Sequence, residues 1–535
     1  MWDVLGWPKS FTCFAASLWC PHQTELFDFP FGVVFFWMLC FSNVFVAILM
    51  ISVFGGLISR LRSPAWWLAR TWTDSSSSDT PFAMMQKQNL GKTPLTVLLP
   101  CYLPNEQYIL NGTITHLMEA LEYDYAFTLI VCYNTPSPLP YETTLRQLDG
   151  KTYPNGRTLK ILKVEGSKSK AENLNEALRL VDTELLVIYD ADHHPDPPSL
   201  LIASAHMLHK NCSCVQGSTY LRERPNLLAS YINAEFFVTH FVFFPAMEFI
   251  SSLGVFGGSN ALWRTEDLRH FEFRHDVQTE DIELSTRAML GGKVTISFCP
   301  ECRSGELPPA TFLALYKQRL RWALGWDQVT LQHMSSIWKA NIHAAQKWGL
   351  YYLLPLRWAL LFSATLNALI TPLVSGIWTL MYPEATLGGP IDDAIFIAIC
   401  GFAVASLALL INILIHEPPR LWPAVLFFQL SGVLYIGWQL LLVLISLAKI
   451  FTGSDGGWEV TTRSAEAAPA CGGDGGNCAA QQTRMGSSSS SAPSSPIALA
   501  ASSPLNAAFT PLGPALLSGR GGSQATASSG KADML

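Results

Sequence analysis

Two aspartates one residue apart, Asp190 and Asp192, are the residues of this sequence whose type and spacing most directly indicate chemistry. They follow the apolar run Leu185–Ile188, which is typical of a buried strand. Two carboxylates at a strand end can hold Mg²⁺ or Mn²⁺, whose remaining positions take oxygens of a diphosphate. His193 comes next and can join the metal shell. The pattern predicts a site for a metal-bound diphosphate, and its alternative is a solvated polar turn.

A second group of residues has helical spacing. Gln318, Arg321 and Trp322 recur at i, i+3 and i+4, so they share one face of a helix. An arginine can pair bidentately with phosphate oxygens, and an indole offers a flat surface for a pyranose ring. Arg319 is expected to point elsewhere, toward lipid headgroups. The alternative is an interfacial amphipathic helix with aromatic anchors.

The elements that must position these residues alternate between strand and helix. This alternation predicts an α/β domain with a mostly parallel sheet covered by helices. The polar motifs fall beyond the carboxyl ends of the strands, where such sheets bind ligands. Strands are expected at Thr96–Pro100, Phe127–Tyr133, Leu159–Val164 and Glu184–Tyr189, and helices at Asn105–Leu121 and Ala171–Val181.

The composition indicates a membrane protein. Apolar residues make up 49% of the chain and charged residues only 14%, where a soluble chain carries about 25% charged residues. The net charge of −6 gives no reason to expect a nucleic-acid partner, and the 12 cysteines lack disulfide-framework or zinc spacing. Four apolar runs exceed the roughly 20 residues of a membrane crossing: Phe31–Ile58, Leu350–Met381, Ile391–Ile415 and Leu421–Ile450.

The charges beside the first run predict the orientation of the chain. Arg60 and Arg62 follow this run, whereas Glu25 and Asp28 precede it. Because basic residues stay preferentially on the cytosolic side, the globular part is expected in the cytosol. The chain is then a multi-pass protein of the plasma membrane or the Golgi.

Three motifs together resemble those of a known family. The Asp190–Asp192 element, Thr279-Glu280-Asp281 and Gln318–Trp322 occur in the order and spacing of the processive, membrane-bound branch of the inverting family-2 glycosyltransferases. Cellulose, chitin and hyaluronan synthases and the cellulose-synthase-like enzymes belong to this branch. The resemblance implies a GT-A-like domain inserted between transmembrane helices. It also implies transfer from a UDP-linked hexose or N-acetylhexosamine to a growing polysaccharide, coupled to export.

The resemblance also implies catalytic roles. Asp281 is the expected general base, which takes the proton of an acceptor hydroxyl, with Glu280 beside it. Arg321 is expected to steady the charge of the leaving nucleoside diphosphate. An alternative for this motif is ordinary capping of a helix by Thr279, with acidic residues in the first turn.

Four residues are expected to bind the nucleotide donor by the same resemblance. Tyr102 and Glu106 follow the first strand, with two residues interposed relative to the family's pattern. Lys170, in a Lys-Ala-x-Asn-Leu-Asn element, is expected to meet the base or a phosphate. Asn134 stands where a typical member has an aspartate that bonds the base. An amide both donates and accepts, so the departure leaves the expected uridine specificity open.

The acceptor and diphosphate are expected to contact Gly258 and Ser259, together with the helix face of Gln318, Arg321 and Trp322. Small residues let the backbone approach a sugar closely. Trp458–Arg463 resembles a gating loop over the nucleotide. Four full crossings would put this segment on the far side of the membrane from the catalytic domain, so the parity of the spans and the motif disagree.

The predicted organisation follows from these assignments. Two rivals stay open: a non-processive transferase acting on a lipid or short glycan, and a transporter with a nucleotide-sugar-sensing domain. The oligomeric state stays open too. The expected parts are an N-terminal region with the first span at 1–62, a linker at 63–93, the transferase domain with interfacial helices at 94–345, transmembrane helices at 346–452, the gating loop at 453–463 and a disordered low-complexity tail at 464–535.

Overall fold

The computed structural model describes residues 26, 30–62, 91–224, 226–381, 387 and 389–454. Most of the predicted linker, the gating loop at Trp458–Arg463 and the predicted tail lie outside these residues. The cysteines within the described ranges are free thiols, as expected.

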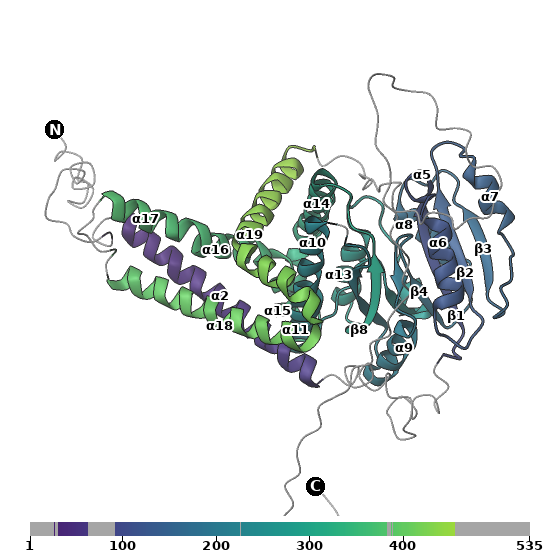
Figure 1. The fold of residues 1–535 in the computed structure, drawn as a ribbon, viewed down its shortest axis with the longest axis horizontal. Coiled ribbons are helices and arrows are strands. Elements are labelled where there is room, and N and C mark those ends of the chain that lie inside the picture. Colours follow the sequence, from purple (N-terminus) through teal and green to yellow (C-terminus); the bar gives the residue numbers. More distant parts are fainter. Residues whose placement is uncertain are drawn as a thin grey trace, which may run out of the picture. The chain divides into compact units, whose positions relative to one another are not determined.

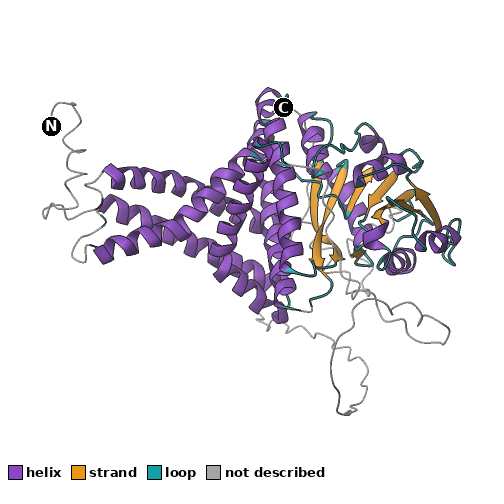
Figure 2. Cartoon of the chain, turned by 90° about the horizontal axis from the view of Figure 1, so that it is seen from above, coloured by secondary structure: helices purple, strands orange, loops and turns teal. Residues whose placement is uncertain are grey.

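Eight strands form one mixed sheet in the order β3-β2-β1-β4-β7-β6-β8-β5 (Figures 1 and 2). The first four in this order are parallel, β7 is antiparallel to both neighbours, and β6 and β8 are parallel to each other. The predicted α/β fold with a mostly parallel sheet is confirmed. The bounds are β1 Leu95–Tyr102, β2 Thr128–Asn134, β3 Thr158–Lys163, β4 Leu185–Ile188, β5 His194–Pro195, β6 Cys214–Leu221, β7 Ala261–Arg264 and β8 Ile296–Glu306.

Both faces of the sheet are covered, because alternate residues of the central strands point to opposite sides. Val97 and Leu99 of β1 lie in one apolar cluster, and Leu98 between them lies in the other. The helices of this domain are α5 Leu103–Glu106, α6 Leu110–Thr115, η4 His116–Ala120, α7 Tyr141–Gln147, α8 Lys170–Leu178, α9 Ser199–Lys210, α10 Leu227–Val238, η5 Thr239–Phe243, α11 Phe244–Ser251, α12 Thr265–Arg269, α13 Glu280–Leu290, α14 Phe312–Lys339 and α15 Ala344–Leu353.

Long apolar helices make up the rest of the described chain. Helices α2 and α18 pack side by side, and α16 contacts both α2 and α19 (Figure 1). The predicted run Phe31–Ile58 lies on α2. The bounds are α2 Pro30–Arg62, α16 Pro355–Thr365, η6 Leu366–Ile370, α17 Thr371–Met381, α18 Gly389–His416, η7 Pro419–Leu421 and α19 Trp422–Phe451.

Four helical stretches of the described residues are long and apolar enough to cross a membrane: Leu227–Ser251, Pro355–Met381, Pro390–Leu414 and Leu434–Phe451. The last three lie within predicted apolar runs, except that Pro390 and Phe451 each fall one residue outside. The first was not predicted as a run, and it is the most buried of the four. Its helix α10 packs on β6 on one side and on α19 on the other. This stretch therefore joins the sheet domain to the apolar helices.

One predicted run begins later than expected. The stretch from Leu350 to Met381 is interrupted at Leu354, whose φ of −100° and ψ of −90° lie outside the helical region. Pro355 follows, and a proline disfavours helical geometry in the residue before it. Leu350 and Leu354 belong to the core beneath the sheet. The apolar helix that can cross the membrane therefore starts at Pro355.

Candidate active site

A cavity of about 400 Å³ opens at the carboxyl ends of β1, β2 and β4 and is closed by α10, α13 and α14. Almost every residue predicted for the site lines it. Gly258 does not, although its neighbours Gly257 and Ser259 do. The predicted residues on the wall are Tyr102, Glu106, Asn134, Lys170, Asp190, Asp192, His193, Ser259, Glu280, Asp281, Gln318, Arg321 and Trp322.

The end of the cavity near β1 and β2 holds the residues predicted to bind the nucleotide base. Tyr102 and Asn134 are neighbours in the register of the two strands. The backbone N–H of Tyr102 donates to Glu106 Oε2 at 2.8 Å, which fixes that carboxylate at the strand end. The buried amide of Asn134 donates to the Ser167 carbonyl at 3.0 Å and accepts from Asn173 Nδ2 at 2.8 Å. Asn134 therefore keeps one N–H and one lone pair for a base edge.

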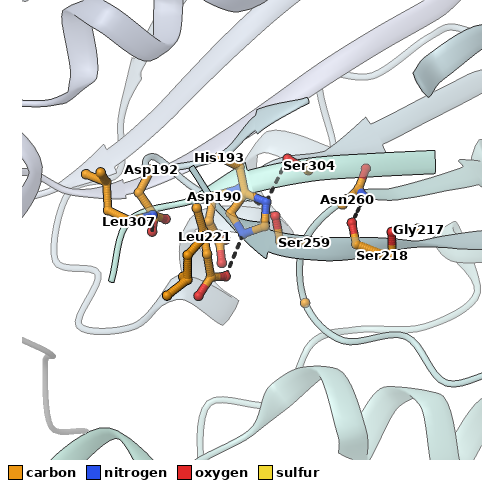
Figure 3. A network of polar contacts seen from close by, with 12 residues as sticks. Asp190, Asp192, His193, Gly217, Ser218, Leu221, Ser259, Asn260, Ser304 and Leu307 are labelled. Atoms are coloured by element: carbon orange, nitrogen blue, oxygen red, sulfur yellow. Dashed lines mark hydrogen bonds and ion pairs between the residues drawn. The ribbon is translucent and has the colours of Figure 1, made fainter. Parts of the chain in front are cut away.

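The two aspartates lie directly beyond β4. The backbone N–H of Asp190 donates to Ser259 Oγ at 2.9 Å, and Asp190 Oδ1 lies 2.5 Å from Lys170 Nζ. Asp192 is 2% exposed and accepts a 3.3 Å bond at Oδ2 from the Leu307 N–H (Figure 3). Both carboxylates border the cavity, and hard oxygen donors suit Mg²⁺ or Mn²⁺. The donor set fits a cation that takes its other ligands from a bound diphosphate.

His193 fits the metal shell less well than predicted. Its Nδ1 lies 3.0 Å from Ser304 Oγ (Figure 3). Its Nε2 lies 3.3 Å from Glu306 Oε2. Burial opposes the charged imidazolium, but Glu306 and the two aspartates outweigh it and raise the pKa of His193. Both ring nitrogens of His193 thus already have protein partners. The contacts favour a role for His193 in holding the Asp190–Asp192 turn against β8.

Lys170 is the cation at the centre of the site. Its Nζ donates to the Gly258 carbonyl at 2.9 Å and also lies 3.8 Å from Glu280 Oε1. Burial disfavours the ammonium ion, yet the carboxylates of Asp190, Glu280 and Asp281 outweigh burial and raise the pKa of Lys170. Lys170 is therefore positively charged near neutral pH. It contacts Asp190 of the predicted metal segment, Gly258 of the predicted acceptor segment and Glu280 beside the predicted general base.

The segment from Gly257 to Asn260 depends on a close backbone approach. Gly258 has a φ of +86°, and a Cβ there would lie 2.8 Å from Asp281 Oδ2. The buried amide of Gln216 accepts from the Gly257 N–H and donates to the Ser259 carbonyl, both at 2.9 Å. Asn260, in the left-handed region with φ of 52°, donates to the carbonyls of strands β6 and β8. The loop is thus rigid and close to Asp281.

Asp281 lies in the first turn of α13, partly exposed to the cavity. Burial raises its pKa most, the Glu280 carboxylate adds to the rise, and Lys170 and Arg321 oppose it, which leaves the pKa of Asp281 at about 7. Such a carboxyl group is poised to accept a proton near neutral pH. Thr279 occupies the N-cap position, but its side chain makes no capping hydrogen bond.

Helix α14 forms the opposite wall. Gln318, Arg321 and Trp322 face the cavity as their spacing predicted, and Arg321 Nη1 donates to the Gln278 carbonyl at 3.3 Å. The expectation for Arg319 is wrong. Its side chain is 3% exposed and forms a 2.8 Å ion pair with Glu235 of α10, because the helix packs against α10 on that side. It does not face lipid headgroups.

Several residues on the wall were not predicted from the sequence. Gln216 is a buried amide that fixes the Gly257–Asn260 loop. Glu235 and His240 reach the cavity from the apolar stretch Leu227–Ser251, and Glu306 reaches it from β8. One sequence signal could have identified Glu235: it is a lone carboxylate within an apolar helix, where a charged residue often has a functional role.

Fold and site together define a glycosyltransferase domain of the GT-A type: parallel strands end at paired aspartates, and a poised carboxyl group lies across the same cavity. Residues 93–325 match the family described as "Glycosyltransferase like family 2". Residues 93–325 thus form a glycosyltransferase family 2 domain, in agreement with the family that the motifs predicted.

Two curated relatives are polysaccharide synthases by name. A probable glucomannan 4-beta-mannosyltransferase 7 of Oryza sativa subsp. japonica is 28% identical over 245 residues, which are 44% of this chain and 39% of the rice protein. A poly-beta-1,6-N-acetyl-D-glucosamine synthase of Staphylococcus epidermidis is 24% identical over 253 residues, 46% of this chain and 58% of that protein. The matches thus span about two fifths to three fifths of these relatives.

Among solved structures, the mannosyltransferase PcManGT from Pyrobaculum calidifontis, described in complex with GDP-Man and Mn²⁺, is similar over 70% of this chain and 100% of its own. Its sequence identity is 19% and the TM-score is 0.41. Because this TM-score is low, the fold is assigned from the strand order of the sheet and not from this similarity.

The contact between α13 and α14 yields a prediction. A Cβ at Gly325, one turn beyond Trp322, would overlap the side chain of Thr279. Gly325→Ala should push the start of α13 away from α14 and lower the rate of sugar transfer by about 100-fold, the scale expected for a displacement of about 1 Å at a reacting centre. Transfer by membranes containing the variant measures this. Gly112→Ala, whose Cβ meets nothing within 4 Å, is the control, and a wild-type rate for Gly325→Ala would refute the spacing role.

Proposed function

We propose that this protein transfers a sugar from a nucleotide-sugar donor to a growing polysaccharide, with inversion at the anomeric carbon and export of the polymer. The observation that carries the proposal is the placement of Asp281, with its pKa of about 7, on the cavity that also holds Asp190 and Asp192. One side of the cavity offers groups for a diphosphate, and the other offers a base for an acceptor hydroxyl.

The proposed donor is a UDP-linked hexose or N-acetylhexosamine. The names of the two relatives, a mannosyltransferase and an N-acetylglucosamine polymer synthase, include both sugar classes. Tyr102, Glu106 and Asn134 surround the end of the cavity that would hold the base. Asp190 and Asp192 would hold Mg²⁺ or Mn²⁺, which when bound would offset the charge of the donor diphosphate.

The transfer is a single displacement. Asp281 takes the proton from the acceptor hydroxyl while its oxygen forms a bond to the anomeric carbon, and the bond from that carbon to the diphosphate oxygen breaks. The nucleoside diphosphate leaves with the bonding electrons. The guanidinium of Arg321 pairs with its phosphate oxygens, and the ammonium of Lys170 adds a second positive charge. Gln318, Trp322 and Ser259, which line the cavity, hold the acceptor sugar.

Polymer synthesis is favoured over the two rivals. A non-processive transferase needs no large acceptor wall, whereas here the wall opposite the aspartates includes α10 and α14, both of which contact α19. A transporter that only senses a nucleotide sugar does not require a carboxyl group such as Asp281, whose pKa is about 7, beside the proposed diphosphate site. The length of the product made from donor alone distinguishes the first rival, and any sugar transfer excludes the second.

Incorporation of radiolabelled sugar tests the proposed reaction. Purified protein in lipid nanodiscs, given UDP- and GDP-linked hexoses and UDP-linked N-acetylhexosamines in turn, should make a polymer from one of them. Transfer should require Mg²⁺ or Mn²⁺, and Asp192→Asn should abolish it, because one of the two cation ligands is lost. Asp182→Asn, an exposed aspartate before the same strand, is the control. Incorporation at full rate in excess chelator would disprove the metal role.

The pH dependence of transfer tests the general base. Because burial and Glu280 raise the pKa of Asp281 to about 7, its reactive carboxylate forms only as the pH rises through about 7. The rate at subsaturating substrate should therefore fall up to tenfold per pH unit below this value and level off above it. Asp281→Asn should transfer at least about 100-fold more slowly and still bind nucleoside diphosphate. Asp276→Asn, on the exposed preceding loop, should keep the profile; a flat wild-type profile would reject the assignment.

The catalytic domain is proposed to face the cytosol, where the nucleotide sugars are. Glu165 is 78% exposed and lies on this domain, so a cysteine introduced there reports its side of the membrane. In a background without other reactive thiols, Glu165→Cys should react with a membrane-impermeant maleimide only after the cells are permeabilised. Labelling of intact cells would reverse the proposed orientation.

A further inference from the structure

Arg319 is a buried cation among the residues predicted to hold the acceptor. Its side chain is 3% exposed, and its Nη2 donates to Glu235 Oε2 at 2.8 Å. The two residues are 84 positions apart and belong to α14 and α10. Burying both charges costs more than their mutual attraction returns unless the geometry is good, and apolar residues of similar size often pack with equal or greater stability. The pair therefore needs an explanation other than stability.

The contacts of Arg319 point to that explanation. Its guanidinium lies over the indole of Trp322, 4.0 Å from the ring centroid. Its Nη1 donates to Gln318 Oε1 at 3.4 Å. Arg319 thus touches both side chains of α14 that would hold an acceptor sugar, although the predicted face of the helix did not include it. One face of the indole is covered by protein, and a sugar has only the remaining surface of Trp322 on which to stack.

Glu235 completes the arrangement from the neighbouring helix α10. It lines the cavity itself and stands next to Phe236, which also lines it. The Phe236 ring lies 5.7 Å from the Arg319 guanidinium. The ion pair therefore fixes the distance between α10 and α14 at the wall of the cavity that would hold the acceptor.

We propose that Glu235 and Arg319 are positioning residues that orient Trp322 and Gln318 and thereby set how tightly the end of the growing glycan is held. The inference rests on the proposed function and adds to it the determinant of acceptor affinity. This role requires the planar guanidinium of Arg319. A guanidinium stacks on an indole and can donate two parallel hydrogen bonds to a carboxylate, whereas an ammonium group does neither. Donor binding does not depend on the pair.

The variant Arg319→Lys distinguishes the stacking contact from the charge attraction. Lysine keeps the positive charge that attracts Glu235, but it loses the planar contact with Trp322. Using the donor identified by incorporation, and chitohexaose or mannohexaose as the acceptor, the variant should raise the acceptor KM about tenfold or more. Its polymer, sized on gels under donor excess, should be shorter. Its affinity for UDP and GDP, measured by calorimetry, should stay within twofold of wild type.

Glu235→Gln should shift the same two quantities, because an amide holds the guanidinium less firmly. The double variant should be no worse than the more affected single variant, since residues that act through one contact are not additive. Lys317→Met is the matched control: it removes a positive charge from the same helix at an exposed position and should leave acceptor KM, polymer length and nucleotide affinity unchanged.

Each outcome decides between the alternatives. Wild-type acceptor KM and polymer length in both Arg319→Lys and Glu235→Gln would overturn the positioning role while leaving the proposed function intact. Equal losses of nucleotide affinity and transfer in both variants would also overturn it, because they would show a structural role alone. Absence of sugar incorporation by the wild-type protein from every donor would instead refute the proposed function.

Discussion

The ammonium group of Lys170 is the contact on which the candidate site depends. Asp190, Glu280 and Asp281 come from segments about 90 residues apart, and three carboxylates in one partly buried cavity repel one another strongly. Lys170 lies 2.5 Å from the first and 3.8 Å from the second, and it also holds the Gly258 carbonyl. One partly buried cation thus lets the segments proposed to bind the metal, bind the acceptor and supply the base share a cavity.

The electrostatic balance around Lys170 also explains why the carboxylates differ. Asp190 Oδ1 lies against the ammonium of Lys170, 2.5 Å from Nζ. Asp281 is placed beside Glu280 and is more strongly affected by burial than by Lys170 and Arg321, so its pKa rises to about 7. The surroundings of the two carboxyl groups therefore differ, and those of Asp281 let it gain and lose a proton near neutral pH.

Much of the domain could be predicted from the sequence, because apolar runs and helical spacing are patterns within short stretches of the chain. The strand expected at Thr96–Pro100 is Leu95–Tyr102, and the apolar run before Asp190 is the four-residue strand β4. Continuous apolar runs identify strands that are buried on both faces. The i, i+3, i+4 spacing likewise placed Gln318, Arg321 and Trp322 on one side of a helix. These inferences used contacts within a few residues.

The failures concern contacts between distant segments. Helical spacing states which residues share a face, but it does not state what covers the other face, so the partner of Arg319 could not be found 84 residues away. The start of the apolar helix at Pro355 was missed for a similar reason. Leu350 and Leu354 are as apolar as the residues that follow, and only the three-dimensional core shows that they pack beneath the sheet.

Helix α14 links the chemistry to the apolar helices. Its Gly325 packs against Thr279 at the start of α13, and its buried Asp327 forms an ion pair with Arg357 and accepts a 2.9 Å bond from Trp358 Nε1, both on α16. Leu320 and Leu324 pack on Leu442 of α19. A buried carboxylate held by two donors resists displacement, because moving it would leave charges unpaired in a region of low dielectric. Arg321 and Trp322 lie on α14 among its contacts with α13, α16 and α19.

A shift of α14 relative to α13 would therefore change the distance from Arg321 to Asp281 and, at the same time, the packing of α14 on α16 and α19. The positions of Arg321 and Trp322 on the cavity wall are in this way set by the same helix that contacts α16 and α19.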